Sequence, residues 1–227
     1  MHTRQNSSYI FAKYRLQRKM GAMIMIKWLK NFWQRFDWRP ATTTILGALL
    51  MAAIYPQMKW APTEWFKEYS WAENLQLAAL AVGIGLAMCA KYEKKMFVFL
   101  AFVLLFLMVR EVNGGRMFFC KLFLATAGDC HWSDMKYGWL ADWVRWGIGI
   151  GVLIFALKSK VWRPLIKYVL KAPIFVWDIV ILLLAVTGSW AAELPCVDNE
   201  ILEESSELLM YVMLAGLVWR YGHVAVK

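Results

Sequence analysis

Residue types that mark metal, redox or nucleotide sites are scarce in this chain of 227 residues. It contains three histidines and four cysteines, without a C-x-x-C or an H-x-x-x-H pair. Structural zinc, b-type haem and dithiol redox chemistry depend on such paired ligands, so the sequence predicts no metal and no cofactor. Gly147-Ile148-Gly149 lacks the strand–helix context of a nucleotide fingerprint, and no motif indicates nucleic-acid binding.

Charged residues are also few, at 19% of the chain, whereas soluble domains carry about a quarter. Hydrophobic residues make up 60%, tryptophan occurs 14 times, and the mean hydropathy is +0.44. The formal net charge is nevertheless +10. This composition excludes a disordered or collagen-like chain and disfavours an ordinary soluble domain. It favours a membrane protein.

Six apolar stretches recur along the chain, and most are close to the roughly 20 residues that a helix needs to cross a bilayer. They are apolar on every face, whereas a soluble helix keeps a polar stripe. We therefore predict an all-α fold: a polytopic bundle of six transmembrane helices within residues 41–219. The alternative is a soluble all-α protein with buried helices. The predicted spans are residues 41–58, 71–90, 96–109, 139–157, 173–192 and 201–219.

Basic residues are concentrated in every second segment between the predicted spans. Residues 1–40 hold nine Lys or Arg and one acid, and the loops after the second and fourth spans hold three and five bases. With the short tail 220–227, one side receives 19 basic and 3 acidic residues, and the other receives 7 and 13. Positive charge stays on the cytoplasmic side of short loops. The sequence therefore predicts a multi-pass protein of the bacterial inner membrane with both termini cytoplasmic.

The tail 1–40 lacks the features of a secretory signal, because its apolar run Met20–Ile26 is short and no small-residue cleavage site follows. From Ile26 onwards, apolar and basic residues alternate at helical spacing: Leu29, Phe32, Trp33 and Phe36, with Lys27, Lys30 and Arg35 between them. This pattern is typical of a basic amphipathic helix on the inner leaflet, in contact with anionic lipids. The alternative is a tail that only fixes topology.

Ionisable residues inside spans cost about 2.5–3.5 kcal/mol each, so their positions are informative. Here they gather near the outer ends of the spans, and Glu203, Glu204 and Glu207 share one helix face. We predict an outward-facing polar pocket just below the periplasmic surface. Its residues are Glu73, Gln76, Arg110, Glu111, Asn113, Arg116, Asp142, Arg145, Glu203, Glu204 and Glu207.

This pocket has three interpretations. It is a structural ion-pair network, a site that binds or transports a cation, a polar solute or a lipid headgroup, or an enzymatic site with paired carboxylates. Our first functional hypothesis is binding or transport. The alternatives are a membrane-embedded enzyme of envelope lipid or glycan metabolism, whose catalytic residues the sequence does not identify, and an accessory subunit of a membrane complex. The predicted partners are membrane lipids and either another membrane protein or a second copy of the chain.

Two further predictions concern single residues. Asp178 lies one turn inside the fifth span, where we expect capping and pairing with Lys171 or Lys167; the alternative is a cytoplasmic gate. Among the cysteines placed at the outer side, Cys130 and Cys196 are the preferred disulfide, because it would tie two outer loops in an oxidising compartment.

Two segments carry a family resemblance. Glu73-Asn74-Leu75-Gln76, followed by Arg110-Glu111-Val112-Asn113-Gly114-Gly115-Arg116, resembles a group of uncharacterised bacterial polytopic membrane proteins, and the first segment resembles the Glu-x-x-Gln of the VanZ-like family. The chain departs from the first group's pattern at Asn113, and it lacks the later Asp-rich run of VanZ-like proteins. The resemblance implies that Glu73, Gln76, Glu111, Asn113 and Arg116 act as a unit, without implying an activity.

Overall fold

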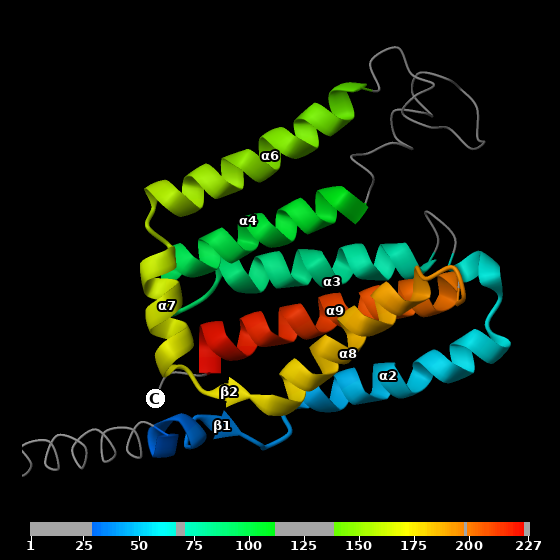
Figure 1. Ribbon diagram of the computed structural model, residues 1–227, viewed down its shortest axis with the longest axis horizontal. Helices are drawn as coiled ribbons and strands as arrows, with labels where there is room; N and C mark the ends of the chain where they lie inside the picture. Colours follow the sequence, from blue (N-terminus) through cyan, green and yellow to red (C-terminus); the bar gives the residue numbers. More distant parts are fainter. Residues whose placement is uncertain (1–28, 67–70, 112–138, 198, 225–227) are drawn as a thin grey trace, which may run out of the picture. The chain divides into compact units, whose positions relative to one another are not determined.

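The computed structural model describes residues 29–66, 71–111, 139–197 and 199–224 (Figure 1). The chain divides into two compact units. The first includes the residues up to Trp38 together with Pro173–Val176, and the second comprises Arg39–Ala172 and Trp177–Lys227.

In the first unit, a helical segment ends at Trp33, and β1 (Phe36–Asp37) pairs in parallel with β2 (Ile174–Phe175). The Phe36 ring lies 5.1 Å from the Phe32 ring and 5.3 Å from the Trp33 ring, centroid to centroid. The predicted amphipathic helix therefore ends before Phe36. The periodicity of the sequence includes Phe36, but its backbone pairs with a segment far along the chain.

Helices make up the second unit, and the prediction of an all-α chain is confirmed. Six of them occupy the six apolar stretches, and a short seventh, α7, follows α6. The helices are α2 (Thr42–Trp60), α3 (Trp71–Met88), α4 (Lys94–Glu111), α6 (Trp139–Lys158), α7 (Trp162–Lys171), α8 (Val176–Ala192) and α9 (Glu200–Trp219), with a 3₁₀ turn at Thr63–Trp65 and a π-helical turn at Arg220–Val224.

Within the described ranges, α3 alone is both long and apolar enough to be a candidate membrane span. Two further helical segments are apolar but shorter: Trp146–Lys158, which is part of α6, and Val176–Ala192, which is α8. The presence of six spans therefore stays a prediction.

The six long helices of the second unit run alternately in opposite directions in chain order (Figure 1). Helix α3 packs against α4 and α9, α9 also contacts α2, and α4 contacts α6. As a result, one end of this unit gathers the ends of α2, α4 and α8 with the starts of α3, α6 and α9. We call this the outer end, and the opposite end, where α7 lies, the inner end.

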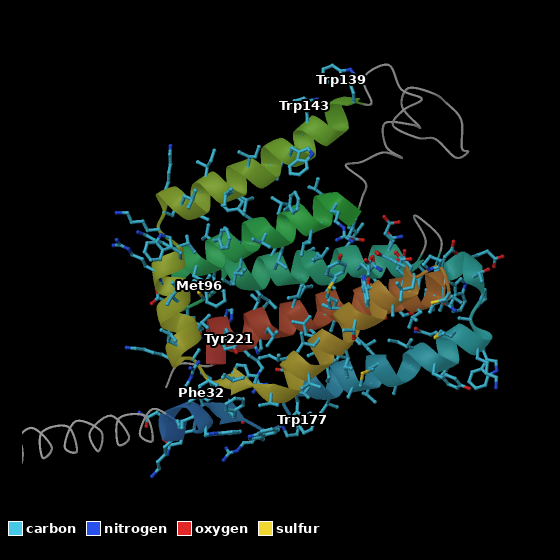
Figure 2. All side chains as sticks on the ribbon, viewed as in Figure 1. Phe32, Met96, Trp139, Trp143, Trp177 and Tyr221 are labelled. Carbon is cyan, nitrogen blue, oxygen red and sulfur yellow. The ribbon has the colours of Figure 1, made fainter. Side chains whose placement is uncertain are left out.

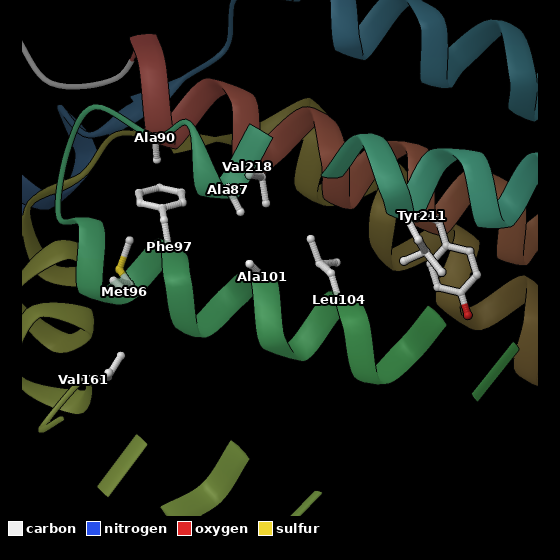
Figure 3. Packing of buried hydrophobic residues seen from close by; sticks show 10 residues of the cluster. Ala87, Ala90, Met96, Phe97, Ala101, Leu104, Val161, Tyr211 and Val218 are labelled. Carbon is white, nitrogen blue, oxygen red and sulfur yellow. The ribbon is translucent and has the colours of Figure 1, made fainter. Parts of the chain in front are cut away.

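The main apolar core lies between α3, α4 and α9. Leu80, Phe97 and Tyr211 are fully buried there, beside small side chains such as Ala87 and Ala101 (Figure 3). The helices approach closely, because a Cβ atom at Gly83 of α3 would lie 3.4 Å from the Cβ of Ala215 on α9. This close contact fixes the relative positions of the helices that carry the polar residues at the outer end.

Candidate functional site

The predicted site residues that the structure describes lie at the outer end, on three neighbouring helices. Gln76 comes from the start of α3 and is fully buried, Arg110 and Glu111 are the last residues of α4, and Glu204 and Glu207 lie near the start of α9. Figure 2 shows side-chain oxygen atoms gathered in this region.

The start of α9 is fixed by a side-chain cap. The Oδ1 atom of Asn199 accepts a hydrogen bond from the Leu202 backbone N–H at 2.9 Å. Glu200 and Glu203 occupy the first turn, where negative charge complements the helix dipole. Their position therefore has a local explanation, whereas Glu204 and Glu207 face other helices.

Arg110 links two of the carboxylates. Its Nη2 lies 3.2 Å from Oε1 of Glu207, and its Nε lies 3.5 Å from Oε1 of Glu111. The Tyr211 hydroxyl donates a hydrogen bond of 2.5 Å to the same Glu111 oxygen. The two carboxylate side chains are 8–9% exposed, but the Arg110 side chain is 56% exposed. The guanidinium therefore covers the carboxylates from the solvent side.

Gln76 binds the third carboxylate. Its Nε2 donates to Oε2 of Glu204 at 2.7 Å and to the Glu204 carbonyl at 3.0 Å. Its Oε1 atom is buried and has no hydrogen-bond partner among the residues that the structure describes. Leaving such an acceptor unpaired costs about 1–3 kcal/mol. We call Gln76, Arg110, Glu111, Glu204, Glu207 and Tyr211 the acidic cluster.

Among the described side chains, the acidic cluster holds three carboxylates and one guanidinium, so acidic groups outnumber basic ones there. Among the residues that the structure describes, no group of three or more His, Cys, Asp or Glu is placed to hold a metal ion. The arrangement therefore offers acceptor oxygens and negative charge to a ligand that donates hydrogen bonds.

The structure thus brings together five of the predicted residues, namely Gln76, Arg110, Glu111, Glu204 and Glu207. Glu73 is buried one turn before Gln76, and Glu203 is half-buried in the first turn of α9. The other predicted residues fall outside what is described: Asn113 and Arg116 as whole residues, Asp142 and Arg145 as side chains on α6, and Cys130 of the predicted disulfide with Cys196.

Sequence reasoning missed two members of this environment. Tyr211 lies one helical turn after Glu207, so the i, i+4 spacing on α9 was a signal for it. The Ser189 hydroxyl of α8 lies 3.5 Å from Oε1 of Glu207, and no sequence pattern indicates that contact.

A second polar group lies at the inner end. Asp178 of α8 is fully buried, and its Oδ2 accepts a hydrogen bond of 2.6 Å from Nη1 of Arg220 at the end of α9. The hydroxyls of Thr43 and Thr44 on α2 also donate to its carboxylate. The described partner of Asp178 is thus Arg220, whereas the sequence favoured Lys171 or Lys167. We call Asp178 and Arg220, together with the two threonines that bind the carboxylate, the buried ion pair.

Comparisons of the chain with protein-family models, curated proteins and solved structures give no significant match. The resemblance to the VanZ-like family therefore stays a prediction.

Proposed function

We propose that this chain is a multi-pass inner-membrane protein in which α2, α3, α4, α6, α8 and α9 cross the bilayer, with both termini cytoplasmic. The support is a polar interior within an apolar exterior. Gln76, Asp178 and Glu207 are buried, whereas Leu49 and Trp146 are 64% and 72% exposed. Exposing such an apolar surface to water costs free energy, whereas exposing it to lipid acyl chains does not.

The exposed tryptophans support the same membrane-spanning arrangement. They lie near both ends of the long helices, where the two interfaces of a bilayer would be. Figure 2 shows Trp139 and Trp143 at one end of α6 and Trp177 at the start of α8. The exposed tryptophans at the outer end include Trp60, Trp65, Trp71, Trp139, Trp143 and Trp190, and those at the inner end include Trp162, Trp177 and Trp219.

Two native cysteines provide a test of this orientation. Cys89 at the inner end and Cys196 at the outer end are both exposed. We expect a membrane-impermeant maleimide added to intact cells to label a variant that retains only Cys196. A variant that retains only Cys89 should be labelled only after permeabilisation. The reverse pattern, or extraction of the protein from membranes by alkaline carbonate, would contradict the proposal.

For the acidic cluster, we propose the binding of a cation of the primary ammonium class. The observation that carries this proposal is the surplus of carboxylates beside the unpaired Oε1 of Gln76. An ammonium group donates up to three hydrogen bonds and accepts none, so it complements a site made of acceptors. Both a free amine and the headgroup of phosphatidylethanolamine carry this group, and the experiment must separate these two sources.

The experiment is calorimetric titration of ethanolamine into the purified protein in phosphatidylglycerol nanodiscs. We expect saturable binding that weakens at least about tenfold in Glu204→Gln, because a hydrogen-bonded charge contributes about 1.5–3 kcal/mol. The matched control is Glu64→Gln, an exposed acid at the same end outside the cluster. Equal affinity in wild type and Glu204→Gln, or no binding in any disc, would refute ammonium binding.

A second set of discs separates the two sources. If the headgroup is the ligand, adding phosphatidylethanolamine to the discs abolishes the ethanolamine signal, and native mass spectrometry finds that lipid retained by the wild type and lost from Glu204→Gln. If a free amine is the ligand, the ethanolamine affinity is the same in both kinds of disc.

A further inference from the structure

Helix α7 occupies a segment that the sequence presents as a basic loop, and its position is set by the turn before it. Lys160 has a φ of +51°, the left-handed conformation that ends many helices. The Val161 N–H donates to the Ala156 carbonyl at 3.1 Å, and the Lys160 N–H donates to the Leu157 carbonyl at 3.2 Å. These two bonds form a Schellman motif, which terminates α6. Figure 1 shows α7 running across the direction of the long helices.

One face of α7 is attached to the bundle. The Tyr168 hydroxyl donates a hydrogen bond of 2.5 Å to the Tyr221 carbonyl, and its ring meets the Phe97 ring edge-on at 6.4 Å between centroids. Burial raises the pKa of Tyr168 to about 12, so the hydroxyl remains a donor at neutral pH. Leu165 packs against the same core. The rotation of α7 about its own axis is therefore fixed.

The face turned away from the bundle is apolar. Trp162, Ile166, Val169 and Leu170 are between 49% and 63% exposed. Their spacing of four, three and one residues places them on one side of the helix. In the described part of the chain, these four side chains form the exposed apolar face of α7.

Positive charge surrounds this apolar face. Lys158, Lys160, Arg163 and Lys171 are all exposed, and residues 158–171 contain no Asp or Glu. The guanidinium carbon of Arg163 lies 5.2 Å from the centroid of the Trp162 ring. A second copy of the chain would bring the same positive face and be repelled, so the charge favours an anionic occupant.

We propose that α7 is an interfacial helix that binds anionic phospholipid, with its exposed apolar face among the acyl chains and its basic residues on the phosphates. Its direction across the long helices is the one expected for a helix in the plane of a membrane surface. This proposal rests on the proposed membrane location, and it is independent of ammonium binding at the acidic cluster.

The first test counts lipids retained by the full-length protein from nanodiscs of mixed phosphatidylcholine and phosphatidylglycerol, using native mass spectrometry. Lys158→Gln, Lys160→Gln, Arg163→Gln and Lys171→Gln are combined in one variant. Since each basic residue near an anionic surface contributes about 1 kcal/mol, we expect the preference for phosphatidylglycerol to fall about fivefold per charge removed. The matched control combines Lys91→Gln, Lys94→Gln and Lys95→Gln, which are exposed at the same end. Equal losses in both variants would refute a specific role of α7.

The second test reports on the apolar face without altering the charges. Ile166→Cys, in a chain whose native cysteines are replaced by serine, is labelled with an environment-sensitive fluorophore. We expect quenching by spin-labelled acyl chains and protection from aqueous iodide. Quenching of the fluorophore by iodide would overturn the proposal. Protection from iodide that disappears when the protein is diluted in the membrane would also overturn it, because it would show that a second copy of the chain covers this face. If the protein passes both tests but alkaline carbonate extracts it from membranes, the six-span arrangement is refuted and the proposal for α7 is not.

Discussion

Helix α9 carries polar groups at both ends, and the two differ in charge balance and exposure. At the inner end, one carboxylate faces one guanidinium, Asp178 is fully buried, and Arg220 is 8% exposed. At the outer end, the described residues of the acidic cluster include three carboxylates and one guanidinium, that of Arg110, whose side chain is 56% exposed.

This difference distinguishes a structural contact between helices from a candidate binding site. Both oxygens of Asp178 accept hydrogen bonds from Arg220, Thr43 or Thr44, so the buried ion pair has no negative charge to offer a ligand. Within the described part of the chain, the acidic cluster has more carboxylates than guanidinium groups and an unpaired acceptor on Gln76. The inner group therefore holds α2, α8 and α9 together, whereas the outer group retains capacity to bind.

The largest expected effect follows from breaking the buried ion pair. Asp178→Ala leaves the Arg220 guanidinium without its carboxylate in a buried position, and we expect the free energy of unfolding to fall by about 3–5 kcal/mol. The measurement is equilibrium unfolding in mixed micelles. Because an ion pair and an apolar pair of similar volume often have similar stabilities, the double variant Asp178→Leu with Arg220→Met should recover most of the loss. A double variant as unstable as Asp178→Ala would contradict the assigned role.

A smaller effect is expected from Tyr211→Phe in the acidic cluster. The change removes a hydrogen bond of 2.5 Å to the Glu111 carboxylate, and bonds to charged groups contribute about 1.5–3 kcal/mol. Tyr168→Phe is the matched control, because its hydroxyl donates to a neutral carbonyl over the same distance and should cost about 0.5–1.5 kcal/mol. Equal losses in the two variants would contradict a stronger bond from Tyr211 to Glu111 than from Tyr168 to the Tyr221 carbonyl.

The comparison also shows what the sequence can predict. The long helices can be predicted because each contains a long apolar run, and such a run can be recognised without knowing which helices pack together. Helix α7 was missed because it has ten residues and mixes lysine with apolar side chains. The one-sided spacing of Trp162, Ile166, Val169 and Leu170 was the available signal, and Pro164 is compatible with a helix because it lies in the first turn.

At the site, the sequence indicates which residues lie at the outer end but not which pairs form. Arg110 and Glu207 are far apart in the chain, and only the packing of α3 against both α4 and α9 brings them within 3.2 Å. Asp178 shows the same limit. Its local neighbours Lys171 and Lys167 were the expected partners, whereas the observed partner, Arg220, ends a helix that packs against α2.

Arg110→Gln tests whether the exposed guanidinium acts as an internal cation. The Arg110 side chain is 56% exposed but its partners Glu111 and Glu207 are only 8–9% exposed, so we expect the free energy of unfolding to fall by about 1–3 kcal/mol, less than for Asp178→Ala. Ethanolamine binding should tighten, because Glu111 and Glu207 lose a competing positive charge. Titration of the variant in phosphatidylglycerol nanodiscs measures this effect. Weaker binding would show that Arg110 contacts the ligand itself, as expected for an anionic group and not for an ammonium ion.

The smallest effect is expected from Ser189→Ala, which removes one of the two longest contacts of the outer group. The Ser189 hydroxyl is 3.5 Å from a Glu207 oxygen that Arg110 already approaches to 3.2 Å, so we expect a change within about 0.5 kcal/mol. Its counterpart at the inner end is Thr44→Ala, which removes a buried hydroxyl donor from the Asp178 carboxylate and should cost about 1.5–3 kcal/mol. Unfolding in the same mixed micelles measures both. A Ser189→Ala loss equal to that of Thr44→Ala would mean that the outer group is as tightly closed as the inner one, which removes the ground for placing a ligand there.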